Sequence, residues 1–297
     1  MIGESDKTSA APAKVSSMPD DTGPRIGLAL GGGGARGLAH LAVLQAFDDL
    51  GVKPHLIAGT SIGAMLGASY ASGLNGADLR EYCRGVLGAR SAVLRHFYTR
   101  WSGSLWDYWN PMTAALFSAE KVMETVLPGT LPDTFEGLQI QLLTVAADFY
   151  AQEQYVSSSG QLLPAVAASA ALPALFKAVE MDGRILIDGG FVNPLPLDLL
   201  RGRVDLIVAV DVSGGRAEAR GGIPRSLEAV IGSQQIALRA IIAEKLKSNA
   251  PDILIRPDVA RFQIMDFLKQ EEILEATAPS RDEVKRALHA LLSRAAA

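Results

Sequence analysis

Residues 26–37 read IGLALGGGGARG, a short apolar run that leads directly into four consecutive glycines. The apolar run, Ile26 to Leu30, is bounded by glycine and is typical of a buried strand. Residues 38–50 follow with apolar side chains near the 3.6-residue spacing of a helix. A glycine turn placed between a strand and a helix predicts an α/β fold.

The same alternation continues along the chain. Residues 56–58 predict a second short strand and residues 62–72 a helix of small side chains. Further apolar runs, each bounded by glycine, proline or acidic residues, predict strands at 140–146, 185–187, 206–210 and 253–255. We therefore expect a three-layer α/β/α fold with a central, mostly parallel sheet.

Two segments depart from this pattern. Residues 1–23 are rich in Ser, Ala, Pro and Asp and lack the apolar core of a signal peptide, so they predict a disordered leader. All three tryptophans, Trp101, Trp106 and Trp109, fall in an aromatic insertion at about 95–117. This insertion is either a lid or membrane-facing patch, which we favour, or a satellite core packed under a loop. We expect the rest, 24–297, to be a single domain with C-terminal helices at about 265–297.

Composition excludes several classes of protein. Hydrophobic residues make up 48% of the 297 residues and charged residues 20%, which is typical of a globular protein with a large core. A net charge of -4 and the lack of a long Lys/Arg run argue against nucleic acid as a partner. One cysteine, Cys83, and four histidines without zinc-ligand spacing predict no internal disulfide, structural metal or cofactor. The single cysteine and the missing signal peptide predict a cytoplasmic protein. Because no run of ~20 apolar residues is present, we expect its contact with lipid to be peripheral.

The glycine run forms an anion cradle, because consecutive glycines let several backbone N–H groups face one side. Gly32, Gly34 and Gly37 also fit the spacing of a dinucleotide-binding turn. That interpretation requires an acidic residue about 20 positions later, at the end of the second strand. Residues 58–61 there read AGTS, which argues against a dinucleotide.

Residues 59–63, GTSIG, match the G-x-S-x-G pattern at a predicted strand-to-helix corner. A tight corner of this kind exposes a serine hydroxyl in front of a helix N-terminus, which makes Ser61 a candidate nucleophile. The alternative is that Ser61 simply caps the following helix.

A serine nucleophile needs a base, and the histidines are poorly placed to supply one. His289 lies in a polar-faced terminal segment, and His40 is expected to be a packing residue. Asp188 instead follows an apolar strand and precedes two glycines, at the carboxyl end where catalytic groups of open parallel sheets gather. Its alternative role is to form a turn before Gly-Gly.

Together these segments resemble the patatin-like phospholipases, in particular their bacterial single-domain branch, over about residues 25–212. The matching blocks, in order, are GGGARG at 32–37, GTSIG at 59–63, ASAALPALF at 168–176, and DGG at 188–190 with Asn193 and Pro196. One difference is QEQ at 152–154, where the family has a glycine-containing turn.

The resemblance implies a serine lipid acyl hydrolase with Ser61 as nucleophile and Asp188 as base. It implies an oxyanion hole in the glycine loop, at Gly32, Gly33 and Gly34. Arg36 would either fix that loop, which we favour, or pair with a substrate phosphate. A lipid ester is the expected substrate. The alternatives are a neutral-lipid, short-chain ester or thioester hydrolase, and a non-catalytic lipid-binding regulator.

Overall fold

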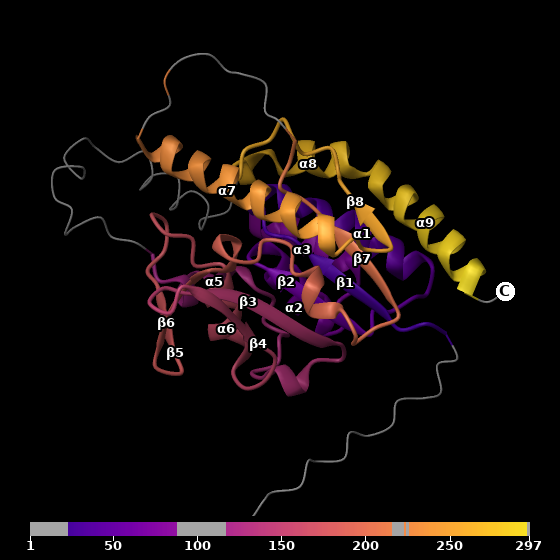
Figure 1. The fold of residues 1–297 in the computed structure, drawn as a ribbon, viewed down its shortest axis with the longest axis horizontal. Helices are drawn as coiled ribbons and strands as arrows, with labels where there is room; N and C mark the ends of the chain where they lie inside the picture. The colour runs from indigo at the N-terminus through magenta and orange to yellow at the C-terminus, as the bar shows by residue number, and fades with distance from the viewer. Residues whose placement is uncertain (1–22, 88–116, 216–222, 224–225, 296–297) are drawn as a thin grey trace, which may run out of the picture.

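The computed structural model describes residues 23–87, 117–215, 223 and 226–295, and within them the strands form one mixed sheet (Figure 1). Strands β3, β2, β1, β7 and β8 lie side by side in that order and are parallel, whereas β4 and β6 are antiparallel to β3, and β5 to β6. Their bounds are β1 Ile26–Leu30, β2 Leu56–Thr60, β3 Gln141–Asp148, β4 Glu153–Ser157, β5 Val179–Met181, β6 Arg184–Asp188, β7 Leu206–Val210 and β8 Ile253–Ile255.

Both faces of the sheet are apolar, because successive side chains of a strand point to opposite faces and each face is covered. Leu28 and Leu30 of β1 pack into a core on one face, and Ala29 packs into a second core on the other. The first face carries α1 His40–Asp49, α2 Ile62–Ala71, α3 Gly76–Leu87, α5 Ala119–Val126, α6 Leu162–Ser169, α8 Gln270–Thr277 and α9 Pro279–Ala295. The second face carries α7 Ser226–Ser248 and the 3₁₀ turn η5 Leu197–Leu200. The predicted three-layer α/β/α fold is confirmed.

The register of β3 explains how two distant segments meet. β2 pairs with residues 141–145 of β3, and β4 pairs with 144–148, so β2 and β4 lie on opposite edges of that strand. β6 pairs with 146–148 and therefore continues the edge that β2 leaves. Since Thr60 is level with Val145 and Asp188 with Ala146, the residue after β2 and the last residue of β6 face each other.

Some element boundaries differ from the prediction. The helix expected over 38–50 is preceded by a 3₁₀ turn, η1 Gly34–Ala39, and the α-helix begins at His40. β4 and β5 were not predicted, because both carry exposed polar side chains, Glu153 and Gln154 in β4 and Glu180 in β5, which interrupt any apolar run. Gln152 stands at the expected glycine turn and adopts φ 57° there.

Several predictions fall outside the described residues. The aromatic insertion, apart from Phe117, and the N-terminal leader, apart from its last residue, lie there. In the described part, the C-terminal segment forms α8 and α9, and α9 packs against α1 with Arg281 ion-paired to Asp49.

Candidate active site

Ser61 occupies a strained corner between β2 and α2. Its backbone has φ 55° and ψ −122°, a conformation that costs a non-glycine residue ~1–3 kcal/mol. The corner is so tight that a Cβ on Gly63 would lie 2.1 Å from the Leu30 carbonyl oxygen. Although Ser61 stands at the N-cap position of α2, its side chain makes no capping hydrogen bond. The hydroxyl is therefore free to point into the site.

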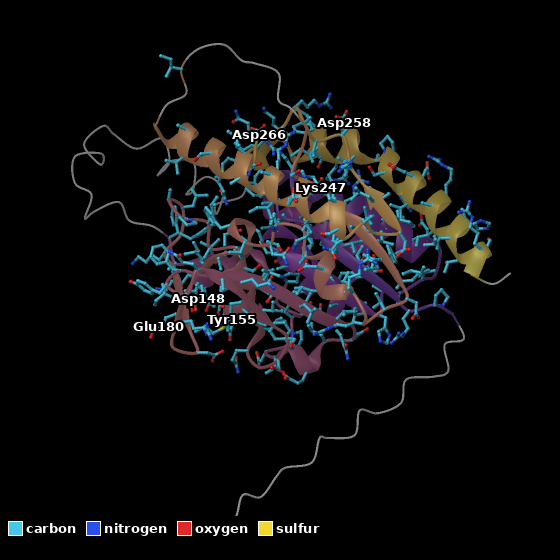
Figure 2. All side chains as sticks on the ribbon, in the orientation of Figure 1. Asp148, Tyr155, Glu180, Lys247, Asp258 and Asp266 are labelled. Atoms are coloured by element: carbon cyan, nitrogen blue, oxygen red, sulfur yellow. The ribbon has the colours of Figure 1, made fainter. Side chains whose placement is uncertain are left out.

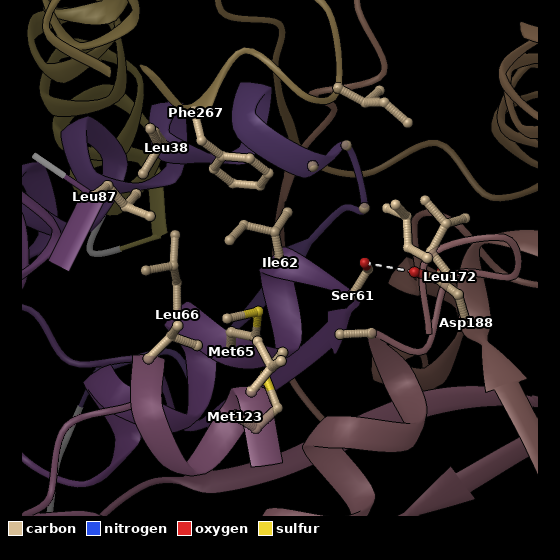
Figure 3. A pocket seen from close by; sticks show the side chains of 18 of the residues that line it. Leu38, Ser61, Ile62, Met65, Leu66, Leu87, Met123, Leu172, Asp188 and Phe267 are labelled. Carbon is tan, nitrogen blue, oxygen red and sulfur yellow. Dashed lines mark hydrogen bonds between the residues drawn. The ribbon is translucent and has the colours of Figure 1, made fainter. Parts of the chain in front are cut away.

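The Ser61 hydroxyl donates a hydrogen bond to Asp188, with Oγ 2.7 Å from Oδ2 (Figure 3). The other carboxylate oxygen, Oδ1, accepts the backbone N–H of Gly190 at 2.7 Å, so Asp188 also forms the turn that its sequence suggests. Asp188 is buried, with 4% of the residue exposed. Burial raises the pKa of this carboxyl from 3.8 to about 6, against the lowering effect of the Ser61 and Gly190 hydrogen bonds. Asp188 is thus ionised at neutral pH and is more basic than an exposed aspartate.

Ser169, the last residue of α6, supports this corner. Its Oγ accepts the backbone N–H of Ser61 at 2.9 Å and donates to the carbonyl of Val145 at 2.6 Å. The hydroxyl therefore holds the backbone of Ser61 against β3 at Val145. We did not predict this role, because the sequence shows Ser169 within a small-residue helix and indicates only packing.

In the glycine loop, the peptide between Gly31 and Gly32 is held by hydrogen bonds, whereas the N–H groups of the next two peptides are available. The Gly32 N–H donates to the Pro194 carbonyl at 2.9 Å, and the carbonyl of the same peptide, Gly31 O, lies 2.8 Å from His40 Nε2. Gly33 and Gly34 line the cavity beside Ser61, and their N–H groups have no hydrogen-bond partner within the described residues. Of the three predicted glycines, Gly32 thus has its donor engaged, and Gly33 and Gly34 have theirs available.

His40 is a neutral, buried member of this loop. Burial lowers the pKa of His40 to about 4, so the ring is neutral at pH 7. Because the Gly31 carbonyl can only accept a hydrogen bond, the single ring proton lies on Nε2.

Arg36 ties the glycine loop to segments from the far end of the chain. Its guanidinium donates to the carbonyls of Phe262 (2.7 Å) and Ser213 (2.6 Å) and to Gln235 Oε1 (2.7 Å). It is not among the residues that line the cavity at Ser61. These contacts support the loop-fixing role, and none of them supports pairing with a substrate phosphate.

The segment after Asp188 adds a polar network that we did not predict. Thr60 Oγ1 donates to the Asn193 carbonyl at 2.7 Å, and the Asn193 amide donates to Gln154 and Asp198. Lys245 of α7 donates to the Asn193 side chain and ion-pairs with Asp198 at 2.6 Å. The network ties the end of β2, directly before Ser61, to the segment that follows Asp188.

A cavity of about 210 Å³ opens at Ser61 and Asp188 and extends between α2, α3 and α5 (Figure 3). Its wall is almost entirely apolar and includes Leu38, Ile62, Met65, Leu66, Leu79, Val86, Leu87, Val122, Met123, Leu172 and Phe267. Cys83 also lines it, and burial raises the pKa of that thiol to about 12, so the thiol stays protonated. The cavity fits an apolar chain whose polar end reaches Ser61.

Within the described residues, no helix is both long and apolar enough to cross a bilayer, and no three His, Cys, Asp or Glu side chains gather as a metal site.

Fold and site together define an α/β protein that presents a serine hydroxyl and a buried carboxylate at the carboxyl edge of its sheet, beside a glycine loop. A family model described as patatin-like phospholipase matches residues 28–201, which is more than half of the chain. The chain belongs to the patatin-like phospholipase family.

Individual relatives and solved structures are similar to this chain over part of their length. An uncharacterized NTE family protein of Mycobacterium tuberculosis is 36% identical over 195 residues, which cover 65% of this chain and 51% of the relative. The lysophospholipase NTE1 of Saccharomyces cerevisiae is 29% identical over 279 residues, 85% of this chain and 16% of the relative. The chain spans about half the length of the mycobacterial relative. Among solved structures, VipD of Legionella pneumophila matches with a TM-score of 0.48 at 13% identity, covering 89% of this chain and 67% of that one.

Proposed function

We propose that this protein is a serine hydrolase that removes acyl chains from membrane-derived lipids, as a phospholipase A or lysophospholipase. The observation that carries the proposal is the 2.7 Å hydrogen bond between Ser61 and Asp188 at the mouth of an apolar cavity. Family membership and the name of the yeast relative support the same substrate class.

In the first half of the reaction, Asp188 takes the hydroxyl proton of Ser61 as Oγ attacks the ester carbonyl carbon. The tetrahedral intermediate then collapses, the ester C–O bond breaks, and the departing alkoxide takes the proton from Asp188. In the second half, Asp188 accepts a proton from water as that water attacks the acyl-enzyme. Returning the proton to Ser61 Oγ releases the fatty acid and restores the site.

The oxyanion of each tetrahedral intermediate needs preorganised donors. We assign these to the N–H groups of Gly33 and Gly34, because the Gly32 N–H already binds the Pro194 carbonyl. A donor of this kind contributes about 3–4 kcal/mol to the transition state in other hydrolases. His40 and Pro194 hold the preceding peptide at both ends, which keeps the two free N–H groups from rotating away.

The strained Ser61 corner supports catalysis over a purely lipid-binding role. A binding protein gains nothing from a serine held at φ 55° against a buried carboxylate, whereas a nucleophile gains a fixed direction of attack.

The proposal is tested with a fluorophosphonate ester probe and with acyl-ester hydrolysis. We expect the native chain to be labelled and active, Ser61→Ala to lose both properties, and Asp188→Asn to lose hydrolysis. Ser72→Ala, at the other end of α2, serves as the matched control and is expected to behave as the native chain. Full hydrolysis by Ser61→Ala, or a native chain that is neither labelled nor active, would refute the proposal.

A further inference from the structure

The turn between β3 and β4 presents two adjacent aromatic side chains to solvent. Phe149 is 54% exposed and Tyr150 is 78% exposed, although large apolar side chains are normally covered. Their rings contact each other edge to face, with centroids 5.2 Å apart and planes at 88°. We call this pair the aromatic tip.

The aromatic tip is held rigidly outward. Asp148 Oδ1 accepts the backbone N–H groups of Tyr150 (3.1 Å) and Ala151 (3.0 Å), and its Oδ2 pairs with Arg184 at 2.8 Å. The Phe149 N–H donates to the carbonyl of Ile185 in the neighbouring β6. These bonds fix the backbone of the turn, so both aromatic residues are anchored at a defined position beyond the end of β3.

The aromatic tip stands beyond the edge of the sheet that carries Ser61. Thr60 is level with Val145, and β3 continues three residues further, to Asp148. At about 3.3 Å per residue along β3, Phe149 lies ~10 Å past the level of Asp188, at the carboxyl end of the parallel strands. A flat surface that touches the tip therefore also faces the catalytic edge.

The side chains around the aromatic tip are mainly acidic. Glu153, Glu180 and Asp182 are exposed on the two adjoining hairpins, whereas Arg184 is paired with Asp148 and Glu153. Lys177, two residues before β5, is the one further cation in residues 176–184. Figure 2 shows Asp148, Tyr155 and Glu180 gathered at this end of the molecule. This charge disfavours an anionic surface and is compatible with a zwitterionic one.

We propose that the aromatic tip is a docking point that inserts into the interface of a zwitterionic lipid surface and turns the Ser61 edge toward it. Aromatic rings with a polar edge, such as that of Tyr150, favour the boundary between headgroups and acyl chains. The inference rests on the proposed function, since a lipid hydrolase must reach ester bonds at such a surface.

The test measures how the full chain partitions onto phosphatidylcholine vesicles in a flotation assay. The variants are Phe149→Ser/Tyr150→Ser at the tip and Val230→Ser/Ile236→Ser on α7 as the matched control, since Val230 and Ile236 are 57% and 73% exposed. We expect the tip variant to lose vesicle binding about tenfold or more and the α7 variant to bind as the native chain. Hydrolysis of a short, monomeric ester in solution should be unchanged by the tip variant.

Native-like vesicle binding by the tip variant would overturn the docking role, as would tighter native binding to vesicles of anionic phosphatidylglycerol. Binding is also measured with Ser61→Ala, which removes catalysis and leaves the tip intact. If that variant binds vesicles while the native chain hydrolyses no ester, the proposed function fails and the docking surface stands. If the native chain hydrolyses the short ester but the tip variant binds normally, the docking surface alone fails.

Discussion

In its proposed role as base, the Asp188 carboxyl must be ionised to accept a proton, yet it is buried where burial penalises its charge. Raising its pKa from 3.8 to about 6 corresponds to ~3 kcal/mol against the ionised folded state. The amide in Asp188→Asn can still accept the Gly190 N–H and face Ser61, but it is no base. We predict that this variant loses hydrolysis by about 10²-fold or more and is up to ~3 kcal/mol more stable at pH 7.

Urea unfolding at pH 7 and pH 4 checks the stability part of that prediction. A carboxyl with a raised folded pKa favours folding at low pH and loses that contribution as pH rises through about 6. The advantage of Asp188→Asn should therefore shrink toward pH 4, where the native carboxyl is protonated. An advantage that is equal at both pH values would contradict the assignment.

The same carboxyl should set the pH dependence of the proposed reaction. In that mechanism Asp188 accepts a proton from Ser61, so we predict that kcat/KM falls as pH decreases through about 6, with one proton involved. His40, whose pKa is lowered to about 4, would place the fall two units lower if it were the base. The pH profile of kcat/KM, measured with an uncharged ester as substrate, distinguishes Asp188 from His40 as the base. A fall in kcat/KM centred near pH 4 would exclude Asp188 as the controlling group.

At the scale of elements, the corner between β2 and α2 requires glycine at position 63, where the backbone of α2 lies against the end of β1. A Cβ at Gly63 would lie 2.1 Å from the Leu30 carbonyl, a contact that neither backbone can relieve locally. We predict that Gly63→Ala costs about 3 kcal/mol of unfolding free energy or more. Within the described residues, a Cβ at Gly85 of α3 would meet no atom outside its own helix within 4 Å, so Gly85→Ala should stabilise by up to about 1 kcal/mol. Equal urea midpoints for the two variants would contradict this account.

The sequence predicts those elements whose side chains are apolar enough to show a period. The bounds of β1, β7 and β8 agree with it to the residue, because each is a buried parallel strand that reads as an apolar run. β4, with Glu-Gln at its start, and the short β5 carry no such signal. Ser61 and Asp188 were predicted as partners from family motifs, and the structure brings them together. The hydrogen bonds that join Gly32 to Pro194 and Lys245 to Asn193 could not be predicted, because no pattern in the sequence links residues so far apart.

At the scale of the whole molecule, the site is assembled from both ends of the chain. The glycine loop after β1 is bonded by Arg36 to Ser213, Gln235 and Phe262, and Ala35 donates to the Ile264 carbonyl. Arg36→Lys keeps the positive charge, but an ammonium group cannot reproduce the three hydrogen bonds that the planar guanidinium donates. We predict that it lowers kcat more than it raises KM, because the proposed oxyanion donors, the N–H groups of Gly33 and Gly34, would shift while the cavity remains. Steady-state kinetics checks this, and a change confined to KM would point to substrate binding by Arg36.

Helices from separate parts of the chain line the apolar cavity. We expect the length of the cavity to determine which acyl chains are hydrolysed. Leu87, at the end of α3, lines the cavity at a distance from Ser61 (Figure 3). Leu87→Trp adds bulk there without touching the Ser61–Asp188 pair, so long-chain esters should lose at least about tenfold in kcat/KM. Short-chain esters, which do not reach Leu87, should react as before.

Leu87→Ala, which enlarges the cavity at the same position, is the control. It should leave the kcat/KM of long-chain and short-chain esters unchanged or favour the longer chain. An equal fall for both chain lengths in Leu87→Trp would show that the cavity does not hold the acyl chain.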